Sequence, residues 1–157
     1  MCGAGTRGRG IAQVVAANGH TAIMYASSIA SAQRHRDELD ASLQKRVAKG
    51  KLPQGAKDAL MANVFVEEES AAADADLVIE CIAEEMGPKK ELFHRLDELC
   101  KPETIFASNT SSLSITEMGH GLKHPLIGMH FFNPVPSMKL IEVIRGVNTP
   151  QETFDFT

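Results

Sequence analysis

The sequence predicts an α/β fold in which helices flank a mostly parallel sheet. Short apolar runs alternate with longer amphipathic segments along the chain of 157 residues, a pattern typical of parallel strands joined by helices. The run at residues 76–82 is almost continuously apolar, as a strand covered on both faces should be. The glycine-rich segment at residues 3–8 leads directly into helical sequence, as a turn from a parallel strand into a helix does.

The first elements follow from periodicity and from helix stop and start signals. Gly19 ends an apolar helix, because glycine is the usual residue after a helix C-terminus. Pro53 suits the first turn of a later helix. A long amphipathic helix lies between them, and the residues expected on its buried stripe are Ile29, Leu39, Leu43 and Val47. The predicted elements are helix 10–18, strand 21–25, helix 27–48, helix 53–62 and strand 64–66.

The second half of the chain continues the alternation. Ser114 and Glu117 have the spacing of a capping box and predict the start of a short helix. The predicted elements are strand 76–82, helix 89–99, strand 104–107, helix 114–122, and strands 126–130 and 138–144. No repeat or obvious linker interrupts them, so we expect residues 1–157 to form one domain.

Composition excludes several classes of protein. The 43% hydrophobic and 23% charged content is ordinary for a soluble globular protein. No apolar run reaches the ~20 residues that span a bilayer, and the N-terminus has no signal-peptide pattern, so we expect a cytoplasmic protein with no membrane partner. A net charge of −4 offers no basic field for nucleic acid. The 3 cysteines have no paired spacing, which indicates reduced thiols and no metal site.

A histidine and a glutamate stand out among the apolar runs near the C-terminus. His130 directly follows the run at residues 126–129, and Glu142 lies inside a second run. Hydroxyl and amide side chains lie nearby in the segment at residues 107–114 and at Asn133. An imidazole close to a carboxylate and polar side chains is typical of a proton-transfer site.

The chain closely resembles the 3-hydroxyacyl-CoA dehydrogenase family, whose members oxidise a 3-hydroxyacyl-CoA to the 3-ketoacyl-CoA with NAD. The resemblance covers residues 3–153 and depends on four blocks in the same order, GAGTRGRGIAQVVAANGH, DADLVIECIAEE followed by KKELF, ASNTSSLSIT and GMHFFNPVPSMKLIEVIRG. It implies a Rossmann-like fold and a place in fatty-acid β-oxidation or short-acyl-CoA metabolism.

The resemblance also implies that the chain is incomplete at both ends. Only Met1 and Cys2 precede Gly3, so we expect most of the first strand to be missing. Family members continue into a C-terminal helical domain, which carries the dimer interface and one wall of the acyl-CoA site. We therefore expect that this chain alone is weakly active or inactive and does not reproduce the family's homodimer.

The glycine-rich segment predicts the cofactor site. It has the pattern G-x-G-x-x-G, which allows a tight turn and a close approach of a pyrophosphate to a helix N-terminus. The resemblance adds residues near the nicotinamide end of NAD. The predicted cofactor residues are Gly3, Gly5, Thr6, Gly8, Glu84, Lys89 and Asn109.

One position departs from the family pattern. NAD-binding folds place an acidic residue ~20 residues after the glycines to bind the ribose hydroxyls, and Ala26 stands there. We favour a disabled or altered NAD site. A preference for NADP, accommodated by Ser27, Ser28 and Arg34, is the alternative.

The resemblance assigns the chemistry to four residues. His130 would accept the hydroxyl proton, and Glu142 would orient the imidazole and stabilise the imidazolium. Ser111 and Asn133 would bind the substrate oxygen. The other histidines are expected on the surface or in turns, and they are His20, His35, His94, His120 and His124.

The long second helix and its end supply the expected CoA contacts. Ser42 matches a family serine, and Lys49 or Lys51 would provide a cation for the phosphates. Without such a ligand, this basic cluster is a solvated helix face. The rival to the dehydrogenase interpretation is a non-catalytic remnant or crystallin-like relative that binds a nucleotide weakly.

Overall fold

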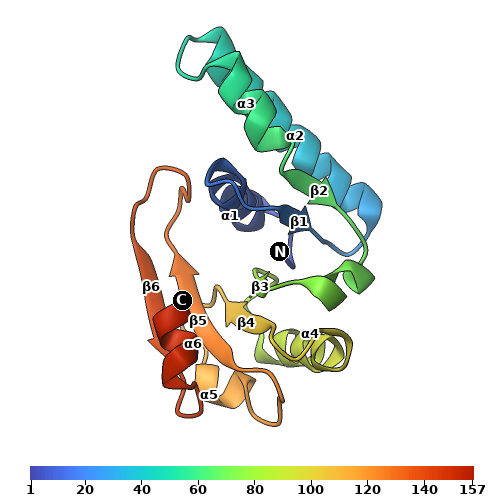
Figure 1. Ribbon diagram of the computed structural model, residues 1–157, viewed down its shortest axis with the longest axis vertical. Helices are drawn as coiled ribbons and strands as arrows, with labels where there is room; N and C mark the ends of the chain where they lie inside the picture. Colours follow the sequence, from blue (N-terminus) through green and yellow to red (C-terminus); the bar gives the residue numbers. More distant parts are fainter. The chain divides into compact units, whose positions relative to one another are not determined.

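The computed structural model describes residues 1–157, which divide into two compact units (Figure 1). The first unit consists of residues 1, 3–68 and 133–138. The second consists of residues 2, 69–132 and 139–157.

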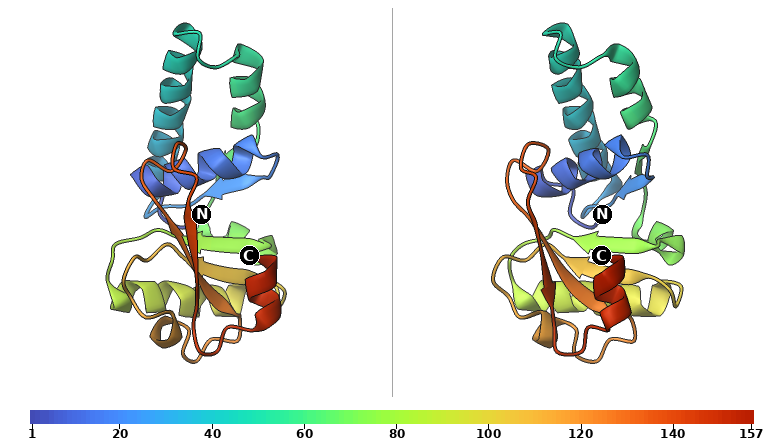
Figure 2. Two further views of the ribbon diagram at one scale, coloured as in Figure 1. Left: turned by 90° about the vertical axis from the view of Figure 1, so that its left-hand side faces the viewer. Right: turned by 60° about the vertical axis from the view of Figure 1, so that its left-hand side comes forward.

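The first unit is a small parallel strand pair covered by helices. Its elements are α1 (Thr6–Ala17), β1 (Ala22–Met24), α2 (Ile29–Ala48), α3 (Gln54–Met61) and β2 (Val64–Val66). Strands β1 and β2 are parallel, with Ile23 opposite Phe65, and α2 and α3 run side by side (Figures 1 and 2). The core combines small residues of α1 with Met24, Leu39 and Leu43. Met1 and Gly3 extend the pairing, because the N–H of Gly3 donates to the carbonyl of Tyr25 at 2.9 Å.

The second unit is a four-stranded mixed sheet in the order β3-β4-β5-β6. Its elements are η1 (Glu69–Asp74), β3 (Leu77–Glu80), α4 (Met86–Leu99), β4 (Ile105–Ser108), α5 (Ile115–Met118), β5 (Leu126–Phe131), β6 (Ile141–Arg145) and α6 (Gln151–Phe156). The first three strands are parallel and β6 is antiparallel to β5. Helix α4 runs along one face of the sheet (Figure 2), where Phe93 packs on Phe106 with 5.4 Å between ring centroids.

Most predicted elements are confirmed, with shifts at their ends. Helix α1 begins at Thr6 instead of residue 10, because the last glycine of the turn is already helical. The helix predicted at 114–122 ends at Met118, although Ser114 caps it as expected by accepting from the N–H of Glu117 at 3.1 Å. Strand β6 begins at Ile141, opposite the last residue of β5, so residues 138–140 have no strand to pair with. The 3₁₀ helix η1 and the short helix α6 were not predicted.

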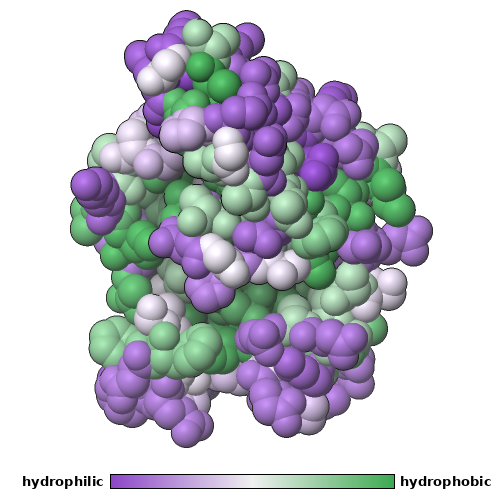
Figure 3. Space-filling view, turned by 45° about the horizontal axis from the view of Figure 1, so that its top comes forward, coloured by the Kyte–Doolittle hydropathy of each residue, from purple (hydrophilic) through white to green (hydrophobic).

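The surface mixes hydrophilic and hydrophobic side chains, as Figure 3 shows for one face. Ile29 is 49% exposed, so its predicted place on the buried stripe of α2 is wrong. The reason is its position as the first residue of α2, outside the core that holds Leu39 and Leu43.

No helix is long and apolar enough to cross a membrane.

All three cysteines are free, and two of them have strongly raised pKa values. Burial is the main cause, raising the pKa of Cys81 to about 12 and that of Cys100 to about 11. Since the thiolate is the reactive form, these thiols are poor nucleophiles at neutral pH.

Candidate active site

The antiparallel pairing of β5 and β6 brings His130 and Glu142 together. The two residues are direct partners in the strand register, so their side chains project from the same face of the sheet. His130 Nδ1 lies 3.0 Å from Glu142 Oε2. The imidazole is buried and the carboxylate is exposed. No hydrogen bond joins His130 Nε2 to the protein, which leaves this nitrogen able to exchange a proton with a ligand.

An aromatic ring holds the imidazole from another side. The ring of Phe132 lies 4.6 Å from that of His130 between centroids, tilted by 55°. Phe131 is buried, while Phe132 is only half-buried and packs against the candidate base.

Glu84 and Ser111 form a second polar contact, between the segments that follow β3 and β4. Glu84 Oε2 accepts from the backbone N–H of Ser111 at 3.1 Å and from its hydroxyl at 3.3 Å. Burial tends to raise the pKa of Glu84, but the N–H of Ser111 and the hydroxyl of Thr110 outweigh it, and the pKa lies below its ordinary value. Glu84 and Ser111 are exposed and thus accessible to a ligand.

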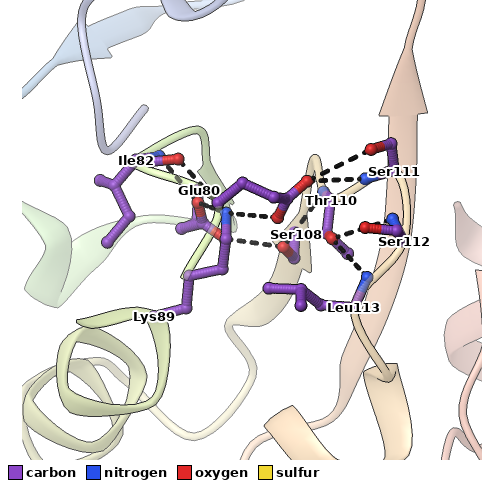
Figure 4. A network of polar contacts seen from close by, with 9 residues as sticks. Glu80, Ile82, Lys89, Ser108, Thr110, Ser111, Ser112 and Leu113 are labelled. Atoms are coloured by element: carbon purple, nitrogen blue, oxygen red, sulfur yellow. Dashed lines mark hydrogen bonds and ion pairs between the residues drawn. The ribbon is translucent and has the colours of Figure 1, made fainter. Parts of the chain in front are cut away.

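Lys89 is held inside the unit by a carboxylate that sequence reasoning missed (Figure 4). The lysine is 2% exposed, and its Nζ lies 2.5 Å from Oε2 of Glu80, which is 0% exposed. Nζ also lies 3.5 Å from Glu84 Oε1. The lysine is therefore a buried ion-pair partner and not a solvated charge. An acidic residue inside the apolar run 76–82 was the available signal for Glu80.

Asn109 connects β4 to the end of β5. Its side-chain oxygen accepts from the backbone N–H of Phe131 at 2.8 Å. The backbone N–H of Asn109 donates to the carbonyl oxygen of Glu80 at 2.9 Å. Asn109 is 4% exposed. The amide thus fixes the strand end that carries His130.

The glycine turn has two positions where only glycine fits. Gly3 has a φ of 95°, in the left-handed region that favours glycine. A Cβ on Gly8 would lie 1.7 Å from the carbonyl oxygen of Gly3. At Gly5, the N-cap of α1, a Cβ would have no atom within 4 Å, and no side chain caps the helix. The free N–H groups of this helix end and the open space beside Gly5 fit an anionic group.

The remaining predicted residues lie in the first unit and are exposed. Asn133 begins the segment 133–138, and Thr6 is the first residue of α1. Ser42 is on α2, Lys49 is its C-cap and Lys51 lies in the turn that follows. The second unit therefore holds the groups around His130 and Glu84, and the first unit holds the glycine turn, Asn133 and the basic cluster.

The sequence matches the family described as "3-hydroxyacyl-CoA dehydrogenase, NAD binding domain" over residues 1–157. The chain belongs to this family. It is 46% identical to the 3-hydroxybutyryl-CoA dehydrogenase of Clostridioides difficile, over 99% of this chain and 56% of that protein. It is 40% identical to the mitochondrial hydroxyacyl-coenzyme A dehydrogenase of Homo sapiens, over 99% of this chain and 52% of that protein.

Solved structures of the 3-hydroxyacyl-CoA dehydrogenase family have the same fold. The crystal structure of the Escherichia coli K12 3-hydroxybutyryl-CoA dehydrogenase aligns with a TM-score of 0.94 and 40% identity, covering 99% of this chain and 34% of that one. The Ralstonia eutropha (S)-3-hydroxybutyryl-CoA dehydrogenase aligns with a TM-score of 0.91 and 36% identity, covering 99% and 56%. The fold is thus Rossmann-like, and the chain spans 33–56% of the length of its first curated relatives.

One histidine is more buried than the sequence indicated. His124 was expected on the surface or in a turn, and it lies in the turn before β5, but it is 7% exposed and stacks on Phe106 with 4.6 Å between ring centroids. Its Nδ1 lies 2.6 Å from Asp97 Oδ1 and its Nε2 lies 2.8 Å from the carbonyl oxygen of Lys101. Both partners are distant in the sequence, so the local pattern gave no signal for them.

Asp97 is the centre of this structural cluster. It also accepts from the N–H groups of Lys123 and His124 at 2.9 to 3.1 Å. Burial tends to raise the pKa of Asp97, but the N–H of Lys123 and the contacts with His124 outweigh it and lower the pKa. The cluster joins α4 to the turn before β5.

Proposed function

We propose that this chain is the cofactor-binding part of an NAD-dependent dehydrogenase that oxidises a 3-hydroxyacyl-CoA to the 3-ketoacyl-CoA. The observation that carries the proposal is the contact of 3.0 Å between His130 Nδ1 and Glu142 Oε2, with Nε2 left without a protein partner. A secondary alcohol can lose a hydride only if a base takes its hydroxyl proton. His130 is such a base, held by an acid through its other nitrogen.

In this mechanism, Nε2 of His130 accepts the proton of the C3 hydroxyl as the C3–H bond breaks and the carbonyl forms. NAD held at the glycine turn would supply the hydride acceptor. Glu142 then stabilises the imidazolium, and the proton leaves to solvent after the ketone has dissociated. Ser111 and Asn133 hydrogen-bond the substrate oxygen and hold C3 in place. In the reverse direction the imidazolium returns the proton to the oxygen.

The residues of the glycine turn fit NAD. The uncapped N-terminus of α1 and the open space at Gly5 suit the pyrophosphate, with Gly3, Thr6 and Gly8 shaping the turn. Glu84, Lys89 and Asn109 are proposed at the nicotinamide end. Lys89 would act through Glu84 instead of as a free cation, since it is buried.

The substrate's CoA portion is assigned to the first unit. Ser42 and the exposed cations Lys49 and Lys51 would bind its phosphates. A homodimer, as in the complete enzymes of the family, and a cytoplasmic location are further predictions. They can be checked by light scattering and by fractionation of the native cell.

The test is the formation of NADH by the full-length protein from NAD and 3-hydroxybutyryl-CoA, with free 3-hydroxybutyrate as the matched substrate without CoA. The proposal predicts turnover at about 1–10³ s⁻¹ with the CoA ester and far slower turnover with the free acid. Saturable NADH binding without turnover of either the CoA ester or the free acid would instead support the non-catalytic alternative. The observation that favours this alternative is Ala26, which stands where NAD-binding folds carry an acidic residue.

A further inference from the structure

Glu80 is a fully buried carboxylate to which the proposed mechanism gives no role. It is 0% exposed at the end of β3. Its Oε1 accepts from the hydroxyl of Ser108 at 2.6 Å, and its Oε2 accepts from the N–H of Ile82 at 2.7 Å and from Lys89 Nζ at 2.5 Å. A buried carboxylate is costly unless it is paired and hydrogen-bonded. These donors satisfy it and lock its position.

One path of contacts leads from Glu80 to the surface through Lys89 (Figure 4). The ammonium touches Glu80 and also lies 3.5 Å from Oε1 of Glu84. The other oxygen of Glu84 accepts both hydrogen bonds that Ser111 donates, at 3.1 and 3.3 Å. Glu84 and Ser111 are exposed, and exposed pairs contribute little by themselves. Their geometry therefore depends on the buried end of the path.

A second path runs from Glu80 through Ser108. The Ser108 hydroxyl donates to Glu80 and accepts from the N–H of Thr110 at 3.3 Å. The Thr110 hydroxyl in turn accepts from the N–H groups of Ser112, at 3.3 Å, and Leu113, at 2.9 Å. The loop after β4 is thus anchored to the same carboxylate, and the backbone from Thr110 to Ser111 joins the two paths into a ring that passes through Glu80.

We propose that Glu80 is a positioning residue for Ser111 and Glu84. It acts from inside the unit, through Lys89 on one side and Ser108 on the other, and touches neither substrate nor cofactor. This inference rests on the proposed function, in which Ser111 binds the substrate oxygen. Its physical reason is that a displacement of about 1 Å of a positioned group can cost on the order of 100-fold in rate.

The first test compares Glu80→Gln with Asp97→Asn in the full-length protein. Each variant removes the charge of one buried carboxylate. Glu80 pairs with Lys89 of α4, whereas Asp97 lies on α4 itself and belongs to the His124 cluster. Glu80→Gln should lower kcat roughly 10- to 100-fold and should raise the KM for NAD about threefold or more, because it displaces both Ser111 and the proposed cofactor contact Glu84. Asp97→Asn should keep kcat within about twofold of wild type per folded molecule. Equal losses of kcat in both variants would overturn the proposal.

Double-mutant cycles separate positioning from general damage. If Glu80 acts through Ser111, adding Ser111→Ala to Glu80→Gln should lower kcat less than about twofold further, because the group is already misplaced. Independent effects would multiply, and that result would overturn the proposal. Ser108→Ala cuts one path without leaving a charge unpaired. It serves if Glu80→Gln does not fold, and it should show the same sub-multiplicative coupling to Ser111→Ala.

Amide hydrogen exchange provides a measurement that does not need activity. Glu80→Gln or Ser108→Ala should speed exchange at the N–H groups of Thr110 and Leu113 by about tenfold or more, and Asp97→Asn should not. Unchanged exchange in the Glu80 and Ser108 variants would overturn the inference even in an active enzyme. Faster exchange in a protein without dehydrogenase activity would overturn the proposed function and leave the ring's structural part intact.

Discussion

At the scale of single residues, the strand register alone brings the proposed proton-transfer pair, His130 and Glu142, into contact. Both residues occupy opposed positions on β5 and β6, so the acid reaches the ring without any loop having to order itself. Phe132 packs against the imidazole ring of His130 on another side. The result is an imidazole with one nitrogen held and the other free, which is the arrangement that reversible proton transfer needs.

Ala26 is the residue whose substitution should most change the choice of cofactor. It is half-buried just after β1, where folds of this kind carry an acid that binds the ribose hydroxyls. Ala26→Asp should tighten NADH binding about tenfold or more and weaken NADPH binding, since each charge-assisted hydrogen bond contributes about 1.5–3 kcal/mol. Fluorescence titration with both nucleotides measures this.

The matched control is Thr21→Asp, which adds the same charge at an exposed position before β1, at the other end of the strand from Ala26. It should leave the ratio of the two affinities near that of wild type. If Ala26→Asp leaves NADH binding unchanged, or if Thr21→Asp has the same effect, the alignment of Ala26 with the ribose-binding position is wrong.

At the scale of elements, two glycines beside the N-terminus of α1 are required for different reasons. Gly8 is required by the fold, and Gly5 by the proposed ligand. Gly8→Ala should lower the free energy of unfolding by about 1–3 kcal/mol or more, because its Cβ would collide with the carbonyl oxygen of Gly3. Gly5→Ala should change it by less than about 0.5 kcal/mol, because its Cβ meets nothing. Chemical denaturation measures both.

The same pair of variants tests the cofactor assignment. Gly5→Ala should still fold but bind NADH at least about tenfold more weakly, because a methyl group would occupy the space that the pyrophosphate approaches. Normal NADH affinity in a folded Gly5→Ala protein would show that the pyrophosphate does not lie at this helix end.

The contact of α4 with the turn before β5 should make stability depend on pH through Asp97. Asp97→Asn should lower the free energy of unfolding by about 1–3 kcal/mol at pH 7, since the His124 ring loses a charged partner. The pKa of Asp97 is lowered in the folded state, so its contribution is fully present above the unfolded pKa of about 3.9. It is lost as the pH falls through the folded pKa.

Unfolding curves of wild type and Asp97→Asn from neutral pH down to about pH 3 check this sign. The difference between the two proteins should be constant near neutrality and should shrink in acid. A difference that grows as the pH falls would mean that the carboxylate is not stabilised in its charged form.

These elements also show which parts of the fold were readable from the sequence. Strands β2 and β5 were predicted to within one residue, because an apolar run bounded by polar or turn residues is a local signal. The partners of buried polar groups are not local: Ser108 meets Glu80 from 28 positions away, and His124 meets Asp97 from 27. Sequence reasoning therefore missed Glu80 and the burial of His124 against Asp97.

At the scale of the whole molecule, family membership could be predicted because four separated motifs occur in order, and the match over residues 1–157 confirms it. The roles of the individual site residues stay predictions. The contact between His130 and Glu142 lay within reach of sequence reasoning, since both belong to strands that follow each other along the chain. What remained out of reach was the ring around Glu80, which requires three-dimensional contacts.

The most direct measurement of the central claim is the single-turnover rate of NADH formation from 3-hydroxybutyryl-CoA by the full-length protein and its His130→Asn variant. The matched control is His124→Asn, which alters the other buried histidine that pairs with an acid. We predict a rate about 10²- to 10⁴-fold lower for His130→Asn at unchanged NADH affinity, and a rate near wild type for folded His124→Asn. A wild-type rate in His130→Asn would contradict the account.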